Sequence, residues 1–138
     1  MPVDEEGRRA LSKVRLSRAR DCLREAEVLL PLEQYKGAAN RSYYAVFHAM
    51  RAVLALDGID RKHHSGIISE FSRLYIKTNI FEKSFSDLIG DQYDYRTSSD
   101  YDDFFVISKS EATEQLENAR LFLDAVEQHL RERGISPE

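Results

Sequence analysis

Two residues in the segment NRSYYAVFHAMRAVLAL, residues 40–56, have the chemistry to act on a phosphate ester. Arg41 carries a guanidinium, which binds phosphate oxygens through paired hydrogen bonds. His48 carries an imidazole, which takes up and releases protons near neutral pH. Most other residues of the segment are apolar, as is typical of a buried helix. The segment therefore raises the question of why such a helix carries an arginine and a histidine.

Arg41 and His48 lie on one face of the helix that this segment predicts. A spacing of seven residues corresponds to two turns, so the two side chains are about 10 Å apart along the helix axis. An extended arginine side chain can close most of this gap, and both residues could then contact one phosphodiester. The opposite face is expected to point into the core, and it consists of Tyr43, Val46, Phe47, Met50, Val53 and Leu54.

The face that carries Arg41 and His48 also carries two alanines, Ala45 and Ala52. Small side chains allow another backbone to approach closely, so we expect something to pack there. Our hypothesis is a second copy of the chain across a two-fold axis, which would bring two Arg/His sets into one cleft. The alternative is that Arg41 and His48 are solvated or paired within the chain and have no catalytic role.

The remainder of the chain predicts further helices around this one. The sequence has 138 residues, of which 42% are hydrophobic and 32% charged, with only six Gly and three Pro. Apolar residues recur at helical spacing in four other segments, and a capping box formed by Ser108 and Glu111 marks the start of the last. The expected helices are residues 5–30, about 35–56, 62–77, 82–95 and 109–131, and residues 104–108 (FFVIS) are expected to form an extended connector.

These segments predict an all-α fold, an antiparallel bundle of four to five helices. We expect one domain, residues 1–138, with the first and last helices packed near each other. The net charge of −4 argues against a protein that wraps duplex DNA, but it allows a local basic site. No segment has the length of a signal peptide or of a membrane span, so we expect a soluble, cytoplasmic protein that does not bind membranes.

The sequence predicts neither a metal site nor a cofactor. His63 and His64 are adjacent in the third predicted helix and point about 100° apart, so they are poorly placed to bind one metal ion. The chain also lacks the paired Glu-x-x-His elements of a di-iron bundle.

Four sequence blocks in order carry a resemblance to a known family. They are AANRSYYAVFHAMRAVLALDG, KHHSGIISEFSRLYIKTNIF, YRTSSDYDDF and SEATEQLENARLFLDAVEQHL. Over about residues 10–130 the chain resembles the HEPN domain family (higher eukaryotes and prokaryotes nucleotide-binding). It is most similar to the prokaryotic stand-alone type that is associated with minimal nucleotidyltransferases.

The resemblance implies a helical bundle that forms a homodimer and a motif of Arg, four to six residues, then His. That motif falls on Arg41 and His48, with six residues between them. It implies metal-independent endoribonuclease activity of the toxin type, with His48 as general acid or base and Arg41 as phosphate clamp. It also implies RNA or a nucleotide as ligand and a nucleotidyltransferase as antitoxin. The alternative that the family offers is a non-catalytic module that binds nucleotide or the partner nucleotidyltransferase.

Four further residues are candidates for substrate binding: Asn40, Ser42, Arg96 and Tyr101. Ser42 follows the motif Arg at a position where active nucleases of the family often have Asn, Asp or His, and Asn40 is the alternative polar neighbour. Arg96 could add a second cation near Arg41, or it could pair with Asp94 or Asp100 and have a structural role. Tyr101 could stack on a base. Ala49 and Met50 follow His48, so we do not expect the tyrosine modification that occurs in one branch of the family.

Overall fold

The computed structural model describes residues 4–136 and confirms the all-α prediction. Within this range the chain forms five α-helices and one π-helix, and no strand. The helices are α1 (Glu5–Leu29), α2 (Tyr35–Leu56), α3 (His64–Phe71), η1 (Ser72–Ile76), α4 (Ser84–Tyr101) and α5 (Lys109–Glu132). The expected domain, residues 1–138, also includes residues 1–3 and 137–138, which lie outside the described part.

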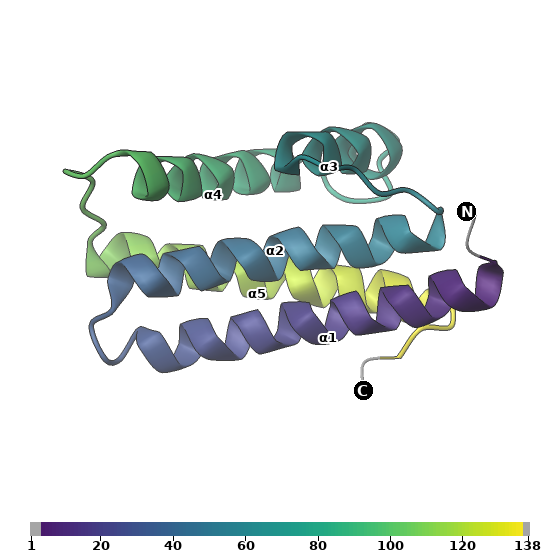
Figure 1. Cartoon of the computed structure of the whole chain (residues 1–138), viewed down its shortest axis with the longest axis horizontal. Helices are drawn as coiled ribbons and strands as arrows, with labels where there is room; N and C mark the ends of the chain where they lie inside the picture. The colour runs from purple at the N-terminus through teal and green to yellow at the C-terminus, as the bar shows by residue number, and fades with distance from the viewer. Residues whose placement is uncertain (1–3, 137–138) are drawn as a thin grey trace.

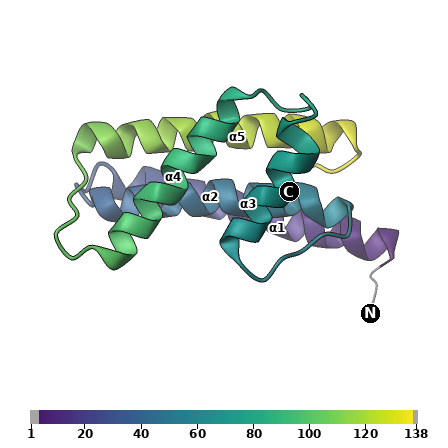
Figure 2. The same ribbon diagram turned by 90° about the horizontal axis from the view of Figure 1, so that it is seen from above.

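The helices alternate in direction and form an antiparallel bundle. α1 and α4 run one way, and α2 and α5 run the other (Figure 1). α2 lies between α1 on one side and α3 and α4 on the other, with α5 behind it (Figure 1), and α4 crosses α2 and α5 obliquely (Figure 2). α2 is therefore the central helix, and it packs against α1, α3, α4 and α5.

The predicted core face of α2 is confirmed. Its six residues are all buried: Tyr43, Val46, Phe47, Met50, Val53 and Leu54. α1 and α5 also pack together, as expected, and two ion pairs connect them, Arg20 with Glu127 at 3.3 Å and Arg120 with Glu27 at 2.8 Å. Within residues 4–136, no helix combines the length and the apolar character that crossing a membrane requires.

The ends of two helices follow local signals in the sequence. The Ser108 hydroxyl accepts from the Glu111 backbone N–H, and the Glu111 carboxylate accepts from the Ser108 N–H, so the predicted capping box is present. At the end of α2, Gly58 has a positive φ of 70°. The backbone N–H groups of Gly58 and Ile59 donate to the carbonyls of Ala55 and Leu54, which is the hydrogen-bond pattern of a Schellman motif.

The structure corrects two helix boundaries. α4 continues to Tyr101, six residues beyond the predicted end at residue 95. Ser, Thr and Asp are weak helix formers, but an ion pair from Arg96 to Asp100 and a hydrogen bond from Tyr95 to Glu111 of α5 hold this extension. The predicted third helix, residues 62–77, is divided into α3 and the π-helix η1, which places Tyr75 and Ile76 in the core.

The hypothesis that a second copy covers the alanine face of α2 is wrong, because α1 covers it. Ala45 and Ala52 are both 0% exposed in the single chain. The Ser12 hydroxyl on α1 donates a hydrogen bond of 2.7 Å to the Ala52 carbonyl oxygen, a contact that requires the two backbones to lie close together. The small residues of α2 therefore accommodate a helix of the same chain.

Candidate functional site

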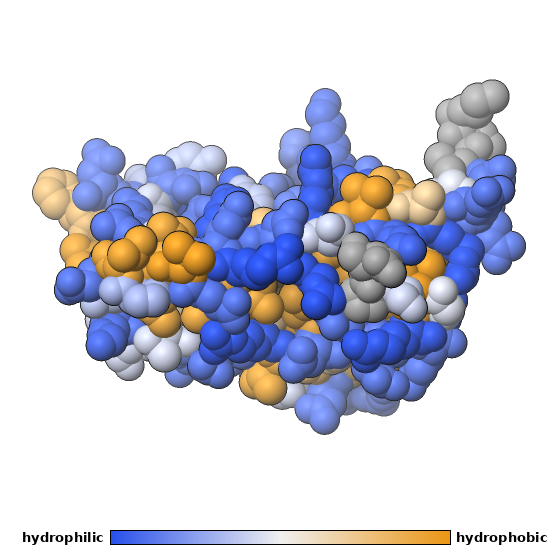
Figure 3. Space-filling view, turned by 90° about the horizontal axis from the view of Figure 1, so that it is seen from below, coloured by the Kyte–Doolittle hydropathy of each residue, from blue (hydrophilic) through white to orange (hydrophobic). Residues whose placement is uncertain are grey.

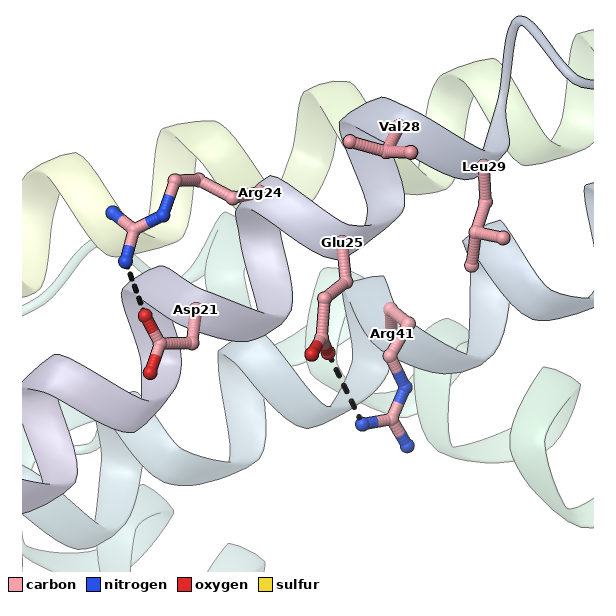
Figure 4. A pocket seen from close by; sticks show the side chains of 6 residues that line it. All are labelled: Asp21, Arg24, Glu25, Val28, Leu29 and Arg41. Carbon is pink, nitrogen blue, oxygen red and sulfur yellow. Dashed lines mark hydrogen bonds and ion pairs between the residues drawn. The ribbon is translucent and has the colours of Figure 1, made fainter.

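Arg41 is held in place by its sequence neighbour and by α1. Asn40 Oδ1 accepts hydrogen bonds from Arg41 Nε at 3.2 Å and from Nη2 at 2.8 Å. On the other side, Arg41 Nη1 lies 3.5 Å from Glu25 Oε1 and 3.9 Å from Cys22 Sγ, both on α1. Figure 4 shows the Arg41 and Glu25 side chains reaching toward each other from the two helices. Asn40 thus fixes the guanidinium, while Glu25 partly neutralises it.

Tyr44 fills the space between Arg41 and His48. The Arg41 guanidinium carbon lies 5.0 Å from the centre of the Tyr44 ring, within the range of a cation–π contact. The centre of the His48 imidazole lies 6.0 Å from the same ring centre. The three side chains therefore follow one another along one face of α2, with an aromatic ring between the cation and the imidazole.

The His48 side chain is half-buried, and its two ring nitrogens are in different surroundings. Nδ1 is buried and has no hydrogen-bond partner among the described residues. Nε2 is therefore the nitrogen that can reach a ligand. No side chain within residues 4–136 fixes the tautomer through Nδ1, which distinguishes His48 from histidines whose role is to complete a hydrogen-bond network.

Burial is the main cause that lowers the pKa of His48, to about 4. Four arginines lower this pKa further, since each disfavours a second positive charge nearby; in order of effect they are Arg51, Arg18, Arg41 and Arg15. The imidazole is consequently neutral at neutral pH. A neutral imidazole can accept a proton but cannot act as an acid until something raises its pKa.

We call the set of Arg15, Arg18, Arg41, His48 and Arg51 the basic face. Arg15 and Arg51 share one carboxylate, Asp60, at 3.3 Å and 3.5 Å, and Arg41 pairs with Glu25. Four guanidinium groups thus face two carboxylates, although the whole chain has a net charge of −4. This is a local excess of positive charge, and a bound phosphate would offset it.

Arg96 approaches the same region from α4. Its Nε lies 3.1 Å from Asp100 Oδ2, so the structural pairing that the sequence allowed is present. Arg96 also neighbours the Tyr44 hydroxyl and lines a small pocket together with Asn40. One arginine thus combines the two roles considered for it, because it pairs with Asp100 and adds a cation next to the basic face.

A model of the HEPN domain family matches residues 12–129 of the chain. The chain belongs to the HEPN family. A UPF0332 protein of Thermotoga maritima is 33% identical over 110 residues, which are 80% of this chain and 83% of that protein. A Methanocaldococcus jannaschii protein named "Putative toxin MJ0142" is 33% identical over 128 residues, 93% of this chain and 86% of that protein. A second protein of that organism, named "Putative toxin MJ0605", is 28% identical over 83% of this chain and 84% of its own length.

The remaining candidate residues of this HEPN chain lie apart from the basic face. Ser42 is 0% exposed, and its hydroxyl donates to the Ala38 carbonyl at 2.9 Å, so the side chain faces the interior. Tyr101 is 80% exposed at the last position of α4. Of the six predicted site residues, the structure brings Arg41, His48, Asn40 and Arg96 together, and it leaves out Ser42 and Tyr101.

Sequence reasoning missed the arginines that α1 contributes to this HEPN site, Arg15 and Arg18. A signal for Arg15 exists, because the buried polar and small residues of α1 recur at steps of three and four: Ser12, Arg15, Ala19, Cys22 and Ala26. This series mirrors the small residues of α2. Two such series in neighbouring helices predict that the helices pack against each other, and they would have placed Arg15 next to α2.

A pocket of about 670 Å³ opens beside Arg41 on the α1 side of the HEPN domain. Asp21, Arg24, Glu25, Val28, Leu29 and Arg41 line it (Figure 4). The surface formed by α1 is mostly hydrophilic, with hydrophobic side chains gathered in a few patches (Figure 3), and its exposed apolar residues include Val28. The pocket therefore offers both polar and apolar contacts next to Arg41.

The adjacent histidines His63 and His64 lie in different surroundings. His64 stacks on Phe47 with ring centres 4.0 Å apart, and its Nδ1 lies 2.7 Å from the Tyr43 hydroxyl. His63 is exposed and precedes α3. Within residues 4–136, no group of three or more His, Cys, Asp and Glu side chains is arranged to hold a metal ion.

Proposed function

We propose that this HEPN protein is an endoribonuclease of the toxin type, which cleaves RNA through attack of a ribose 2′-hydroxyl on the adjacent phosphate. The observation that carries the proposal is a neutral, half-buried His48 among four arginines on one face of α1 and α2. The names of two relatives, which describe them as toxins, are in line with it. The chain's own side chains supply the proton acceptor and the positive charge, so we propose a reaction without a metal ion.

His48 is the general base of the proposed reaction. Its neutral imidazole accepts the 2′-hydroxyl proton through Nε2, and the oxygen then attacks phosphorus. The bound phosphodiester brings a negative charge close to the arginines, which raises the pKa of His48 from its value in the free protein. Proton transfer is therefore easier once RNA is bound.

Arg41 clamps the phosphate. Its long, exposed ion pair with Glu25 contributes little and can be exchanged for a phosphate oxygen. Asn40 keeps the guanidinium oriented during this exchange, since both Asn40 contacts come from Nε and Nη2. Arg15, Arg18 and Arg51 stabilise the negative charge that builds up on phosphorus-bound oxygens.

The family resemblance supplies the partners in this proposal. A nucleotidyltransferase serves as antitoxin, and the active form is a homodimer. The interface must use a surface other than Ala45 and Ala52, which α1 covers.

The test is incubation of the purified protein with total RNA and with tRNA in EDTA. Wild type, His48→Ala and the control His63→Ala are compared, since His63 is an exposed histidine outside the basic face. We expect wild type and His63→Ala to produce 2′,3′-cyclic phosphate and 5′-hydroxyl ends, and His48→Ala to produce none. Equal cleavage by all three proteins would contradict the role of His48.

The second candidate is a module that binds nucleotide without cleaving RNA. It is favoured by the arginine excess, which binds phosphate whether or not a reaction follows. It predicts that wild type leaves RNA intact, and that Arg41→Ala weakens nucleotide binding measured by isothermal titration calorimetry.

A further inference from the structure

Cleavage of RNA by its own 2′-hydroxyl needs two proton transfers, and His48 accounts for one. The second proton must reach the 5′ oxygen that leaves, because an alkoxide is a poor leaving group. His48 is neutral before the reaction and receives the first proton, so another group has to donate the second in the same step. The inference below rests on the proposed ribonuclease function and identifies the missing acid.

His64, the first residue of α3, shares two aromatic neighbours with His48. The centre of the Tyr44 ring is 5.8 Å from the centre of the His64 imidazole and 6.0 Å from that of His48. The centre of the Phe47 ring is 4.0 Å from His64 and 5.7 Å from His48. The two imidazoles thus pack against the same pair of aromatic rings on α2.

We propose that His64 is the general acid of the reaction. His48 Nε2 takes the proton of the 2′-hydroxyl, and the 2′ oxygen forms a bond to phosphorus. The bond from phosphorus to the 5′ oxygen breaks, its electron pair stays on that oxygen, and the oxygen takes the proton of His64 Nε2. The products are a 2′,3′-cyclic phosphate and a 5′-hydroxyl; His48 ends protonated and His64 neutral, so charge and protons balance.

The contacts of His64 suit an acid that acts through Nε2. Its Nδ1 lies 2.7 Å from the hydroxyl of Tyr43, a buried residue whose pKa is raised by burial, so the hydroxyl stays protonated. A hydroxyl can accept from the Nδ1–H of the charged imidazole and donate to Nδ1 of the neutral one. Tyr43 therefore supports both states of His64 and leaves Nε2 for the substrate, and the stacking on Phe47 fixes the plane of the ring.

The charges around the two histidines differ by one carboxylate. Burial lowers the pKa of His64, and Arg96 of α4 and Arg51 of α2 lower it further, but Asp100 of α4 raises it. At His48 the charged groups that shift the pKa are all arginines, and each lowers it. A carboxylate beside an imidazole favours its protonated form, and a bound phosphodiester acts in the same direction, so His64 is the better placed of the two to carry the proton of an acid.

The other histidines do not fit this role. His129 packs against Tyr75 and Phe81 on η1 and the segment after it, away from Tyr44. His63 is exposed, and its side chain does not cap α3. His64 is thus the histidine, among the described residues, that shares aromatic neighbours with His48.

The experiment compares two RNA oligonucleotides that contain the cleaved bond, one with the natural 5′ oxygen and one with sulfur in place of that oxygen. A thiolate leaves without being protonated, so the sulfur substrate does not need a general acid. We expect His64→Gln to lower kcat/KM at least about 100-fold on the oxygen substrate and only a few-fold on the sulfur substrate. His48→Gln should lower both.

Several outcomes separate the inference from the proposed function. If His64→Gln lowers kcat/KM equally on both substrates, or on neither, the role of His64 as acid is wrong. Cleavage by wild type would still support the ribonuclease in that case. If wild type cleaves neither RNA, the proposed function itself fails. The wild-type pH profile tests the role without any variant: kcat/KM should fall on the basic side for the oxygen substrate and not for the sulfur substrate, and the same fall for both would overturn it.

Discussion

The basic face and a second cluster, where α2 and α5 end, contain similar residue types in different arrangements. This second cluster, the closing cluster, consists of Asp57, Tyr75, His129 and Arg133. The Tyr75 hydroxyl donates to Asp57, and Arg133 donates to the Tyr75 oxygen at 2.9 Å and pairs with Asp57 at 3.3 Å. His129 lies against the Tyr75 ring, with Arg133 Nη1 3.4 Å from its Nε2.

The difference between the two regions lies in the balance of charges and hydrogen bonds. In the closing cluster one arginine meets one carboxylate, and a tyrosine bonds to both. In the basic face four arginines meet two carboxylates, and Nδ1 of His48 has no partner among the described residues. A balanced cluster stabilises the fold, because it ties α2, η1 and α5 together. An unbalanced one leaves positive charge uncompensated and is suited to an anionic ligand.

The largest effect is expected when one arginine from each region is replaced. Arg41→Ala should lower RNA cleavage about 100- to 1,000-fold, because it removes charge stabilisation at the reacting phosphate. It should change the unfolding free energy little, since the Arg41 ion pair is mostly exposed. Arg133→Ala should do the reverse, with a lower denaturation midpoint and unchanged cleavage by the folded protein. Equal losses of cleavage in both variants would remove the contrast between the regions.

The next effect concerns the packing beneath the basic face. Ala52→Leu should lower the unfolding free energy by about 1–3 kcal/mol, because the added side chain meets α1 at close range. Urea denaturation at two protein concentrations measures it, and we expect the loss to be independent of concentration. A variant of unchanged stability that loses only its dimeric state would restore the idea that Ala52 faces a second copy.

A smaller effect is expected from removing one hydroxyl in the closing cluster. Tyr75→Phe keeps the buried ring and deletes the hydroxyl that joins Asp57 to Arg133, so stability should fall by about 1 kcal/mol. Tyr101→Phe is the matched control, since the Tyr101 side chain is 80% exposed. Thermal unfolding should separate the two variants, and an equal fall in melting temperature would argue against the closing cluster as a stabilising element.

The smallest effect is the dependence of stability on acid. The pKa of His48 is lowered from 6.5 to about 4 in the folded chain, mainly by burial, so the unfolded chain takes up this proton first as pH falls. The stability contribution is complete above pH 6.5 and is lost as pH falls toward 4. After allowance for solvent screening we expect His48→Gln to reduce the stability lost between pH 7 and pH 4.5 by about 1 kcal/mol. The unfolding free energies of wild type and variant are measured by denaturation at each pH. If both fall by the same amount over this range, His48 contributes nothing to the pH dependence.

Most of the fold could be predicted because its signals are local. Helical spacing of apolar residues, the capping box at Ser108 and the glycine after α2 each depend on a few neighbouring residues. The end of α4 could not be predicted in this way. Its last turns consist of weak helix formers, and the hydrogen bond from Tyr95 reaches Glu111 on a different helix.

The candidate site, too, could be predicted from the sequence only in part. The spacing of Arg41 and His48 shows by itself that they share a face of α2, because helix geometry is fixed by the backbone. The sequence does not tell which surface covers Ala45 and Ala52 on that face, and the structure shows that α1 does. The burial of His48, the approach of Arg15 and Arg18 and the position of His64 beside Phe47 all follow from contacts between different helices.

The sequence by itself therefore determined the helices, the family resemblance and the pair of residues that can act on a phosphate. Only the tertiary structure decided the protonation of His48 and the second histidine that can complete the reaction. The physical reason is the distance along the chain over which each effect acts. Helix periodicity and capping act within a few residues of the chain, whereas desolvation and Coulomb interactions depend on which side chains from other helices lie within a few ångströms.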